Sequence, residues 1–173
     1  MAVQAYLGAL FLTGALLGMA GTGAAAKATG ITSGLPVPRY VSLKSDHVNV
    51  RVGPTKDQDV SWIYTRAGLP VEITAEFENW RRVRDSEGAE GWVYHSLLSG
   101  RRTAVVTMKQ KDDLAALYDR PDPGSAVAAR LQAGVVAQVK RCSGGWCRIL
   151  GKGFDGWIEQ QRLWGVYADE VLN

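Results

Sequence analysis

The sequence has few of the residues on which hydrolytic and metal-dependent chemistry depends. It contains only two histidines, His47 and His95, and two cysteines. A nucleophile with a positioned base, or a metal held by three or four His, Cys and carboxylate ligands, cannot be assembled from this set. The carboxylates Asp85, Glu87 and Glu90 lack the Asp/Asn/Gly spacing of a calcium loop. We therefore expect a protein that is not an enzyme and that holds no metal or cofactor.

A strong excess of one charge sign is also missing. The 20 Lys and Arg residues oppose 17 Asp and Glu residues, and the basic residues form no continuous stripe along the chain. Proteins that bind nucleic acids usually concentrate Lys and Arg on one face or one helix. We therefore expect no nucleic-acid partner.

Charged side chains are absent from Ala2 to Ala26. The apolar run from Ala5 to Ala20 leads into small residues, and Ala24 and Ala26 fit the Ala-x-Ala requirement of a signal peptidase. We predict that residues 1–26 are a signal peptide and that the mature chain is periplasmic or secreted, with no stable membrane span. The alternative is an uncleaved segment that anchors the chain to the inner membrane, because the apolar run approaches the roughly 18 residues that cross a bilayer.

Glycine and tryptophan, in contrast, are plentiful, with 20 and 6 residues. Many short strands need glycine at their turns, so this composition favours an all-β protein. The chain also matches itself at a shift of about 66 residues: residues 79–83 fall on 145–149, and 91–93 fall on 156–158 after a one-residue slip. The order and spacing of the matching blocks indicate an internal duplication.

Each repeat has short β-prone segments separated by Gly, Pro, Asn and Asp. In the first repeat the predicted strands are 48–52, 60–65, 71–77, 80–84 and 91–94. Five short strands in roughly 60 residues bury one face only by curling into a small closed barrel. We predict an all-β fold of two tandem five-stranded barrels, residues 35–100 and 112–168, joined by an ordered strand within 101–111. Barrels of this size have small cores, so we expect the two to pack together.

The motifs of the first repeat resemble a known family. Val48-Asn49-Val50-Arg51, Gly53-Pro54, Gly68-x-Pro70-Val71, Trp80-x-x-Val83 and Gly91-Trp92-Val93 are similar to the bacterial SH3 domain. The paired units resemble exported proteins of Gram-negative bacteria, especially alphaproteobacteria, that carry tandem bacterial SH3 domains. The resemblance covers residues 35–168. It implies two SH3-like barrels that bind peptidoglycan, cell-wall peptide or an envelope protein, although the second unit departs from the motif at Tyr118-Asp119-Arg120-Pro121.

The resemblance also indicates where a ligand binds. In SH3 barrels generally, the Trp three residues before a core aliphatic residue projects outward and forms one wall of a peptide groove. Trp80 and Trp146 have this spacing. Strand alternation directs every second side chain, such as Trp80 and Arg82, to the same outer face. The predicted ligand-binding residues are Trp80, Arg82, Arg84, Trp92, Tyr94 and Trp146.

A competing interpretation assigns the protein a structural role. In that case it is a structural or oligomeric envelope subunit, its tryptophans are buried between units or in an oligomer, and it has no small ligand. Polyproline recognition is not expected, because Tyr94-His95-Ser96-Leu97 stands where a groove of that kind needs a Pro and a Tyr.

The two cysteines, Cys142 and Cys147, flank a predicted hairpin turn. Facing positions in an antiparallel pair have Cβ atoms roughly 4.5 to 5.5 Å apart, and export exposes the chain to an oxidising compartment. We therefore predict a disulfide. At the 66-residue shift the matching pair is Glu76 and Arg81, for which we predict an exposed ion pair.

Overall fold

The computed structural model describes residues 28–108 and 113–173. The predicted signal peptide, residues 1–26, lies outside the described residues. Regular structure in the described part is almost entirely β, as predicted. The only helices in this part are two 3₁₀ turns, η1 (His95–Leu97) and η2 (Gln160–Arg162). Within these ranges no helix has the length and hydrophobicity that a membrane span requires.

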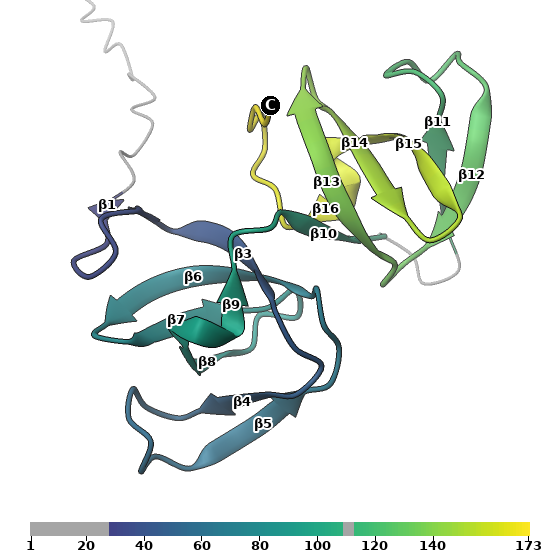
Figure 1. Ribbon diagram of the computed structural model, residues 1–173. Helices are drawn as coiled ribbons and strands as arrows, with labels where there is room; N and C mark the ends of the chain where they lie inside the picture. The colour runs from purple at the N-terminus through teal and green to yellow at the C-terminus, as the bar shows by residue number, and fades with distance from the viewer. Residues whose placement is uncertain (1–27, 109–112) are drawn as a thin grey trace, which may run out of the picture.

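The first unit is an antiparallel sheet of seven strands in the spatial order β5-β4-β8-β7-β6-β3-β9 (Figure 1). The strands are β3 (Arg39–Leu43), β4 (Val48–Arg51), β5 (Val60–Tyr64), β6 (Pro70–Phe77), β7 (Trp80–Arg84), β8 (Glu90–Tyr94) and β9 (Leu98–Ser99). A short hairpin of β1 (Ala28–Thr29) and β2 (Pro36–Val37) precedes this sheet.

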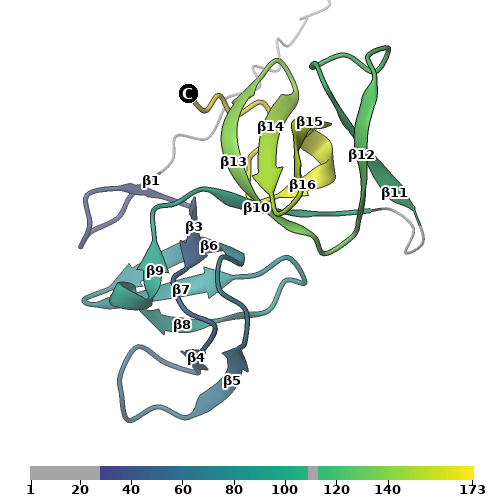
Figure 2. The ribbon, with the colours of Figure 1, turned by 45° about the vertical axis from the view of Figure 1, so that its right-hand side comes forward.

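The second unit is an antiparallel sheet of seven strands in the order β12-β11-β15-β14-β13-β10-β16. Its strands are β10 (Thr103–Val106), β11 (Leu114–Tyr118), β12 (Val127–Gln132), β13 (Val136–Ser143), β14 (Trp146–Gly151), β15 (Phe154–Glu159) and β16 (Leu163–Trp164). The two sheets form two separate bodies that lie side by side (Figure 2).

The strand orders of the two units correspond position by position, which confirms the duplication. The β6–β7 pair has a register shift between Ile73 and Ala75, and the β13–β14 pair has one between Val139 and Arg141. These bulges are also 66 residues apart, so the sequence shift and the backbone irregularity agree.

Each sheet has two strands more than the five predicted. In the first unit the missed strands are β3, which pairs with β6, and β9, which pairs with β3. In the second unit β10 pairs with both β13 and β16, and all four of its side chains are buried. The ordered strand expected within 101–111 is present as β10, and it belongs to the second sheet because its buried Ala104 and Val106 side chains complete that core.

The core of the first unit consists of aliphatic side chains that alternate inward along the strands. It is formed by Val41, Leu43, Val48, Val50, Val71, Ile73, Val83, Val93 and Leu98. The second core is equivalent and additionally contains both cysteines. Gly91 and Gly156 lie where strands cross closely, since a Cβ at these positions would meet Val50 and Leu117 respectively. This close approach explains why glycine precedes tryptophan in both repeats.

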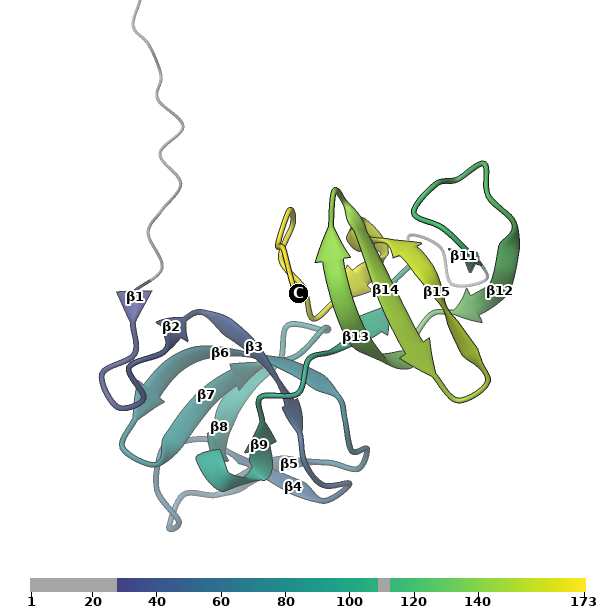
Figure 3. The same ribbon diagram turned by 45° about the horizontal axis from the view of Figure 1, so that its top comes forward.

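The two units contact each other through aromatic and charged side chains. The Tyr40 ring lies 5.3 Å from the Trp164 ring and 4.7 Å from the Tyr167 ring, measured between centroids. Beside these rings Arg102 pairs with Glu170 at 2.8 Å. The connection from β9 to β10 runs from the first sheet to the second (Figure 3). The expected packing of the two barrels against each other is confirmed.

Candidate functional site

The predicted residues of the first unit come together on one face of the β7–β8 pair. Trp80 lies opposite Tyr94, Arg82 opposite Trp92, and Arg84 opposite Glu90. The intervening residues Val83 and Val93 point to the core and have no exposed surface. Alternation along a strand therefore placed the predicted residues on one face correctly. We call Trp80, Arg82, Arg84, Trp92 and Tyr94 the aromatic–arginine face.

Trp80 is less accessible than predicted. Only 8% of its surface is exposed, and its ring packs edge-on against Tyr94 with the centroids 5.4 Å apart. The prediction that Trp80 projects from the barrel as an exposed wall is therefore wrong. The strand pattern correctly excluded Trp80 from the aliphatic core, but it carried no information about the neighbouring side chains that cover an outward-facing ring.

Trp92 occupies the centre of the aromatic–arginine face. It is half-buried and lies between two arginines on adjacent strands, Arg51 on β4 and Arg82 on β7. The Arg82 guanidinium pairs with Glu90 at 2.6 Å, and the Arg82 side chain is half exposed. Trp92 and Arg82 thus present a flat ring and a positive group to solvent from neighbouring strands, an arrangement suited to peptide or sugar ligands.

Arg84 is directed to the junction of the two units instead. Its guanidinium donates two hydrogen bonds to the buried Glu72 carboxylate, which also accepts one from the Tyr167 hydroxyl at 2.9 Å. Burial and the neighbouring Glu72 charge raise the pKa of Tyr40 to about 12, and the pKa of Tyr167 rises for the same reasons. Both phenols are therefore neutral at physiological pH, and the Tyr167 hydroxyl donates to Glu72.

Trp146, the predicted residue of the second unit, is more exposed than Trp80. It is half-buried, and its ring contacts Tyr118 edge-on with a centroid separation of 5.6 Å. It lies opposite Glu159, whereas Trp80 lies opposite an aromatic ring. Trp146 also lines a pocket of about 370 Å³ together with Glu159 and Gln160. The second unit therefore offers an aromatic surface of different chemistry from the first.

The cysteine prediction is confirmed. Cys142 and Cys147 face each other across the β13–β14 pair and form a disulfide. Glu76 and Arg81 face each other in the same way across β6–β7, with Arg81 Nε 3.4 Å from Glu76 Oε1. The predicted ion pair is thus present, but the prediction that it is exposed is wrong, since the Glu76 and Arg81 side chains are only 1% and 9% exposed.

Glu76 is buried because the N-terminal hairpin covers it. The Glu76 carboxylate accepts hydrogen bonds from the Ser33 hydroxyl at 2.6 Å and the Ser33 amide at 3.0 Å, and it pairs with Arg39 at 2.8 Å. Burial raises the pKa of Glu76, but the hydrogen bonds from Ser33 and Arg39 and the charge of Arg81 outweigh burial and lower it to about 2. Sequence spacing revealed the Arg81 partner, but it did not reveal Ser33 or Arg39.

A groove of the first unit was missed by sequence reasoning. It has a volume of about 430 Å³ and is lined by Trp62 and Tyr64 of β5, by the β7–β8 turn and by Val105 of the second unit. The Tyr64 hydroxyl donates to Asp85 Oδ2 at 2.9 Å, which raises the Tyr64 pKa in addition to the effect of burial. Trp62 and Tyr64 are two positions apart in the sequence and therefore share one face of β5. The sequence does not show that the β7–β8 turn, which carries Asp85, lies opposite that face.

The two histidines lie at the surface of the first unit. His47 and His95 are exposed, and His95 packs against the Tyr94 ring with the centroids 5.1 Å apart. Among residues 28–108 and 113–173, no three His, Cys, Asp or Glu side chains are grouped as metal ligands.

Comparison with known proteins gives a family match and distant structural matches, two of which are described below. The model of the bacterial SH3 domain matches twice, over residues 44–100 and 111–165. The solved structure of NlpC2 from Trichomonas vaginalis is 16% identical and covers 73% of this chain, and that of NlpC1 from the same organism is 15% identical and covers 78%. In each case the match covers 48% of the solved chain, with a TM-score of 0.31. This chain thus spans about half the length of those structures. No curated protein matches it.

Proposed function

Because this chain belongs to the bacterial SH3 domain family, we propose that it is a non-catalytic exported protein that binds the cell wall. In this proposal the ligand is a peptidoglycan peptide or an envelope protein, and the aromatic–arginine face of the first unit contacts it. The bacterial SH3 domains are usually extracellular or periplasmic modules, and the Cys142–Cys147 disulfide fits an oxidising compartment.

The observation that carries the proposal is the position of Trp92 between Arg51 and Arg82. Tryptophan and arginine are enriched among the residues that contribute most binding energy in protein recognition. A half-buried ring supplies apolar area that is already ordered, and Arg82 supplies donors for a carboxylate or peptide carbonyl. Trp80 and Tyr94 pack together beside this centre and hold its border in place.

The structural subunit is the second candidate function, and the burial of aromatic side chains favours it. Trp80 and Trp157 are each 8% exposed, and Trp164 lies in the contact between the units. If the half-buried Trp92 and Trp146 are covered by other copies of the chain, the aromatic surfaces serve assembly. Iodide quenching separates the two proposals, because only a monomer with an open face allows iodide to quench a substantial part of the native tryptophan fluorescence.

Sedimentation of the mature protein with purified peptidoglycan sacculi tests the proposed function. We expect the protein to pellet with sacculi, and we expect the Trp92→Ala and Arg82→Ala variants to remain largely in the supernatant. Trp62→Ala is the matched aromatic control, because Trp62 lies in the separate groove beside Asp85. Arg130→Ala is the matched cationic control on an edge strand of the second unit. Equal binding of all four variants would count against the aromatic–arginine face.

A further inference from the structure

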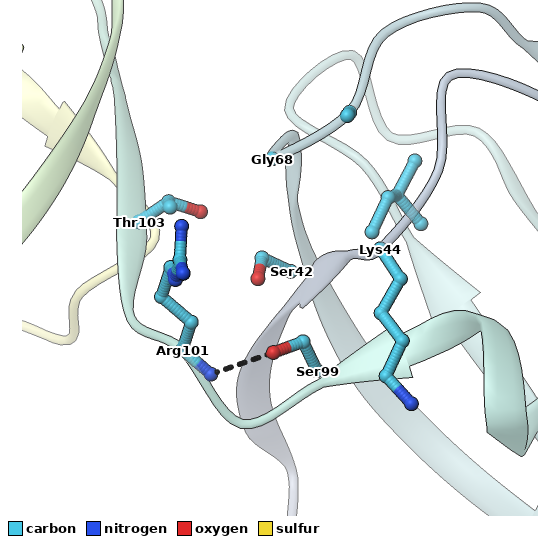
Figure 4. Close-up of a pocket in the computed structure, with 8 residues that line it drawn as sticks. Ser42, Lys44, Gly68, Ser99, Arg101 and Thr103 are labelled. Atoms are coloured by element: carbon cyan, nitrogen blue, oxygen red, sulfur yellow. Dashed lines mark hydrogen bonds between the residues drawn. The ribbon is translucent and has the colours of Figure 1, made fainter.

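A separate pocket lies where the chain passes from the first unit to the second. It has a volume of about 310 Å³ and lies between β3, the β9–β10 connection and the start of β10 (Figure 4). Its polar lining consists of hydroxyl and basic side chains, namely Ser42, Lys44, Ser99, Arg101 and Thr103. No acidic residue lines it. This pocket, which we call the junction pocket, is distinct from the aromatic–arginine face.

One hydroxyl group of the junction pocket is buried without a hydrogen-bond partner among the described residues. Thr103 is only 6% exposed, and its Oγ1 is a buried polar atom without a hydrogen-bond partner among the described residues. Ser42, which is 2% exposed, lines the same pocket. Buried hydroxyl groups are normally paired, because leaving one unpaired is costly. Each such group marks a position where an acceptor fits.

Arg101 brings a free positive charge to these hydroxyls. Its guanidinium forms no ion pair or hydrogen bond within residues 28–108 and 113–173, and only its backbone amide is engaged, with Ser99 Oγ at 3.2 Å. Figure 4 shows the guanidinium between Thr103 and Ser42. The Lys44 ammonium points away and donates to the Ser96 carbonyl at 2.9 Å. One positive charge therefore faces the pocket.

We propose that the junction pocket binds one carboxylate group. The Arg101 guanidinium presents two parallel N–H donors, the geometry that a carboxylate accepts in bidentate form. The hydroxyls of Thr103 and Ser42 donate to the remaining lone pairs of the same oxygens. A carboxylate has a single negative charge that Arg101 neutralises, whereas a phosphate dianion would keep a charge that nothing else in the pocket compensates. Because Ser42 and Thr103 belong to different units, a bound carboxylate contacts both units.

The test is an NMR titration of the ¹⁵N-labelled mature chain with N-acetyl-alanyl-alanine and, separately, with its C-terminal amide. We expect saturable shifts of the Arg101 and Thr103 signals with the acid and none with the amide. Arg101→Gln should weaken binding about tenfold or more, as expected for a charge-assisted hydrogen-bonded pair. Thr103→Val, which replaces only the hydroxyl with a methyl group, should weaken it by a smaller factor.

Arg120→Gln is the matched control, because Arg120 is an exposed arginine in a loop of the second unit that does not line the pocket. Equal shifts with the acid and the amide would overturn the proposal. So would tighter saturation of the same signals by inorganic phosphate, or equal losses in Arg101→Gln and Arg120→Gln. The sacculus experiment depends on Trp92 and Arg82, so a failure of the junction pocket is distinguishable from a failure of the aromatic–arginine face.

Discussion

Glu76 and Arg81 occupy, across the β6–β7 hairpin, the same facing positions that a disulfide occupies across the β13–β14 hairpin. The duplicated units thus link equivalent strands by different chemistry. The disulfide of the second unit is covalent and completely buried. The ion pair of the first unit is buried by the N-terminal hairpin and extended to Ser33 and Arg39. The two links therefore respond to different perturbations, the ion pair to pH and the disulfide to reductant.

Glu76→Gln should destabilise the protein substantially. The substitution leaves the guanidinium groups of Arg39 and Arg81 without their anion in a buried site, and breaking a buried pair costs about 3 to 5 kcal/mol. Urea unfolding followed by tryptophan fluorescence measures the loss. Glu90→Gln is the control, since the Arg82–Glu90 pair is partly exposed and should contribute less than about 1 kcal/mol. Similar losses in the two variants would refute a special role for the Glu76 site.

Stability should fall between pH 5 and pH 2 because of Glu76. The folded-state pKa of about 2 lies below the ordinary value of 4.5, so the native state binds fewer protons than the unfolded state in this range. The contribution of Glu76 is therefore present above pH 4.5 and is lost as the pH falls toward 2. Free energies of unfolding measured from pH 7 to pH 2 should show this slope. Glu76→Gln should flatten it, and an unchanged slope in that variant would contradict the prediction.

Removal of the disulfide should destabilise the second unit by about 2 kcal/mol, the value expected for closing a loop of this length. The Cys142→Ala/Cys147→Ala double variant, compared with wild type in urea, measures this loss. Thiol titration of the denatured, non-reduced chain should find no free thiol, and titration after reduction should find both. Two free thiols in protein purified from the periplasm would contradict the disulfide.

Trp80→Ala should destabilise the first unit by about 3 kcal/mol, in the range for truncating a buried aromatic side chain. Trp92→Ala should cost less, because Trp92 is half-buried and its replacement leaves no enclosed cavity. Urea unfolding of both variants tests the order. Equal stability of Trp80→Ala and wild type would mean that the Trp80 ring is not packed in solution.

Much of the fold followed from the sequence. The central strands were predicted from the alternation of Val48 to Arg51, from the Gly, Pro, Asn and Asp residues between strands, and from the internal repeat. The 66-residue shift of that repeat related the Glu76–Arg81 pair to the two cysteines. The outer strands were harder to predict. The strand Arg39–Leu43 has buried side chains at four successive positions and therefore lacks a two-residue alternation. Leu98–Ser99 is too short to show any period.

The site was less predictable than the fold. Alternation determines which face of a strand a residue occupies, so it grouped Trp80, Arg82 and Trp92 correctly. It does not determine what covers that face. The Trp80 ring packs against Tyr94, and Arg84 binds Glu72, which also accepts a hydrogen bond from Tyr167 of the other unit. Contacts between residues almost a hundred positions apart leave no local pattern in a single sequence.

The contact of Tyr40 with Trp164 and Tyr167 has a consequence for binding to a polymer. Because the units are held together by these rings and by the Glu72 hydrogen bond, the distance between their outer surfaces is set by packing, not by a flexible linker. If both units bind the same polymer chain, the second binding step gains from a raised effective concentration only when the ligand groups of the polymer repeat at that distance. Under the proposed cell-wall binding, a polymer with another repeat length would engage one unit at a time. The spacing of the two units would then select among polymers of identical chemistry by their periodicity.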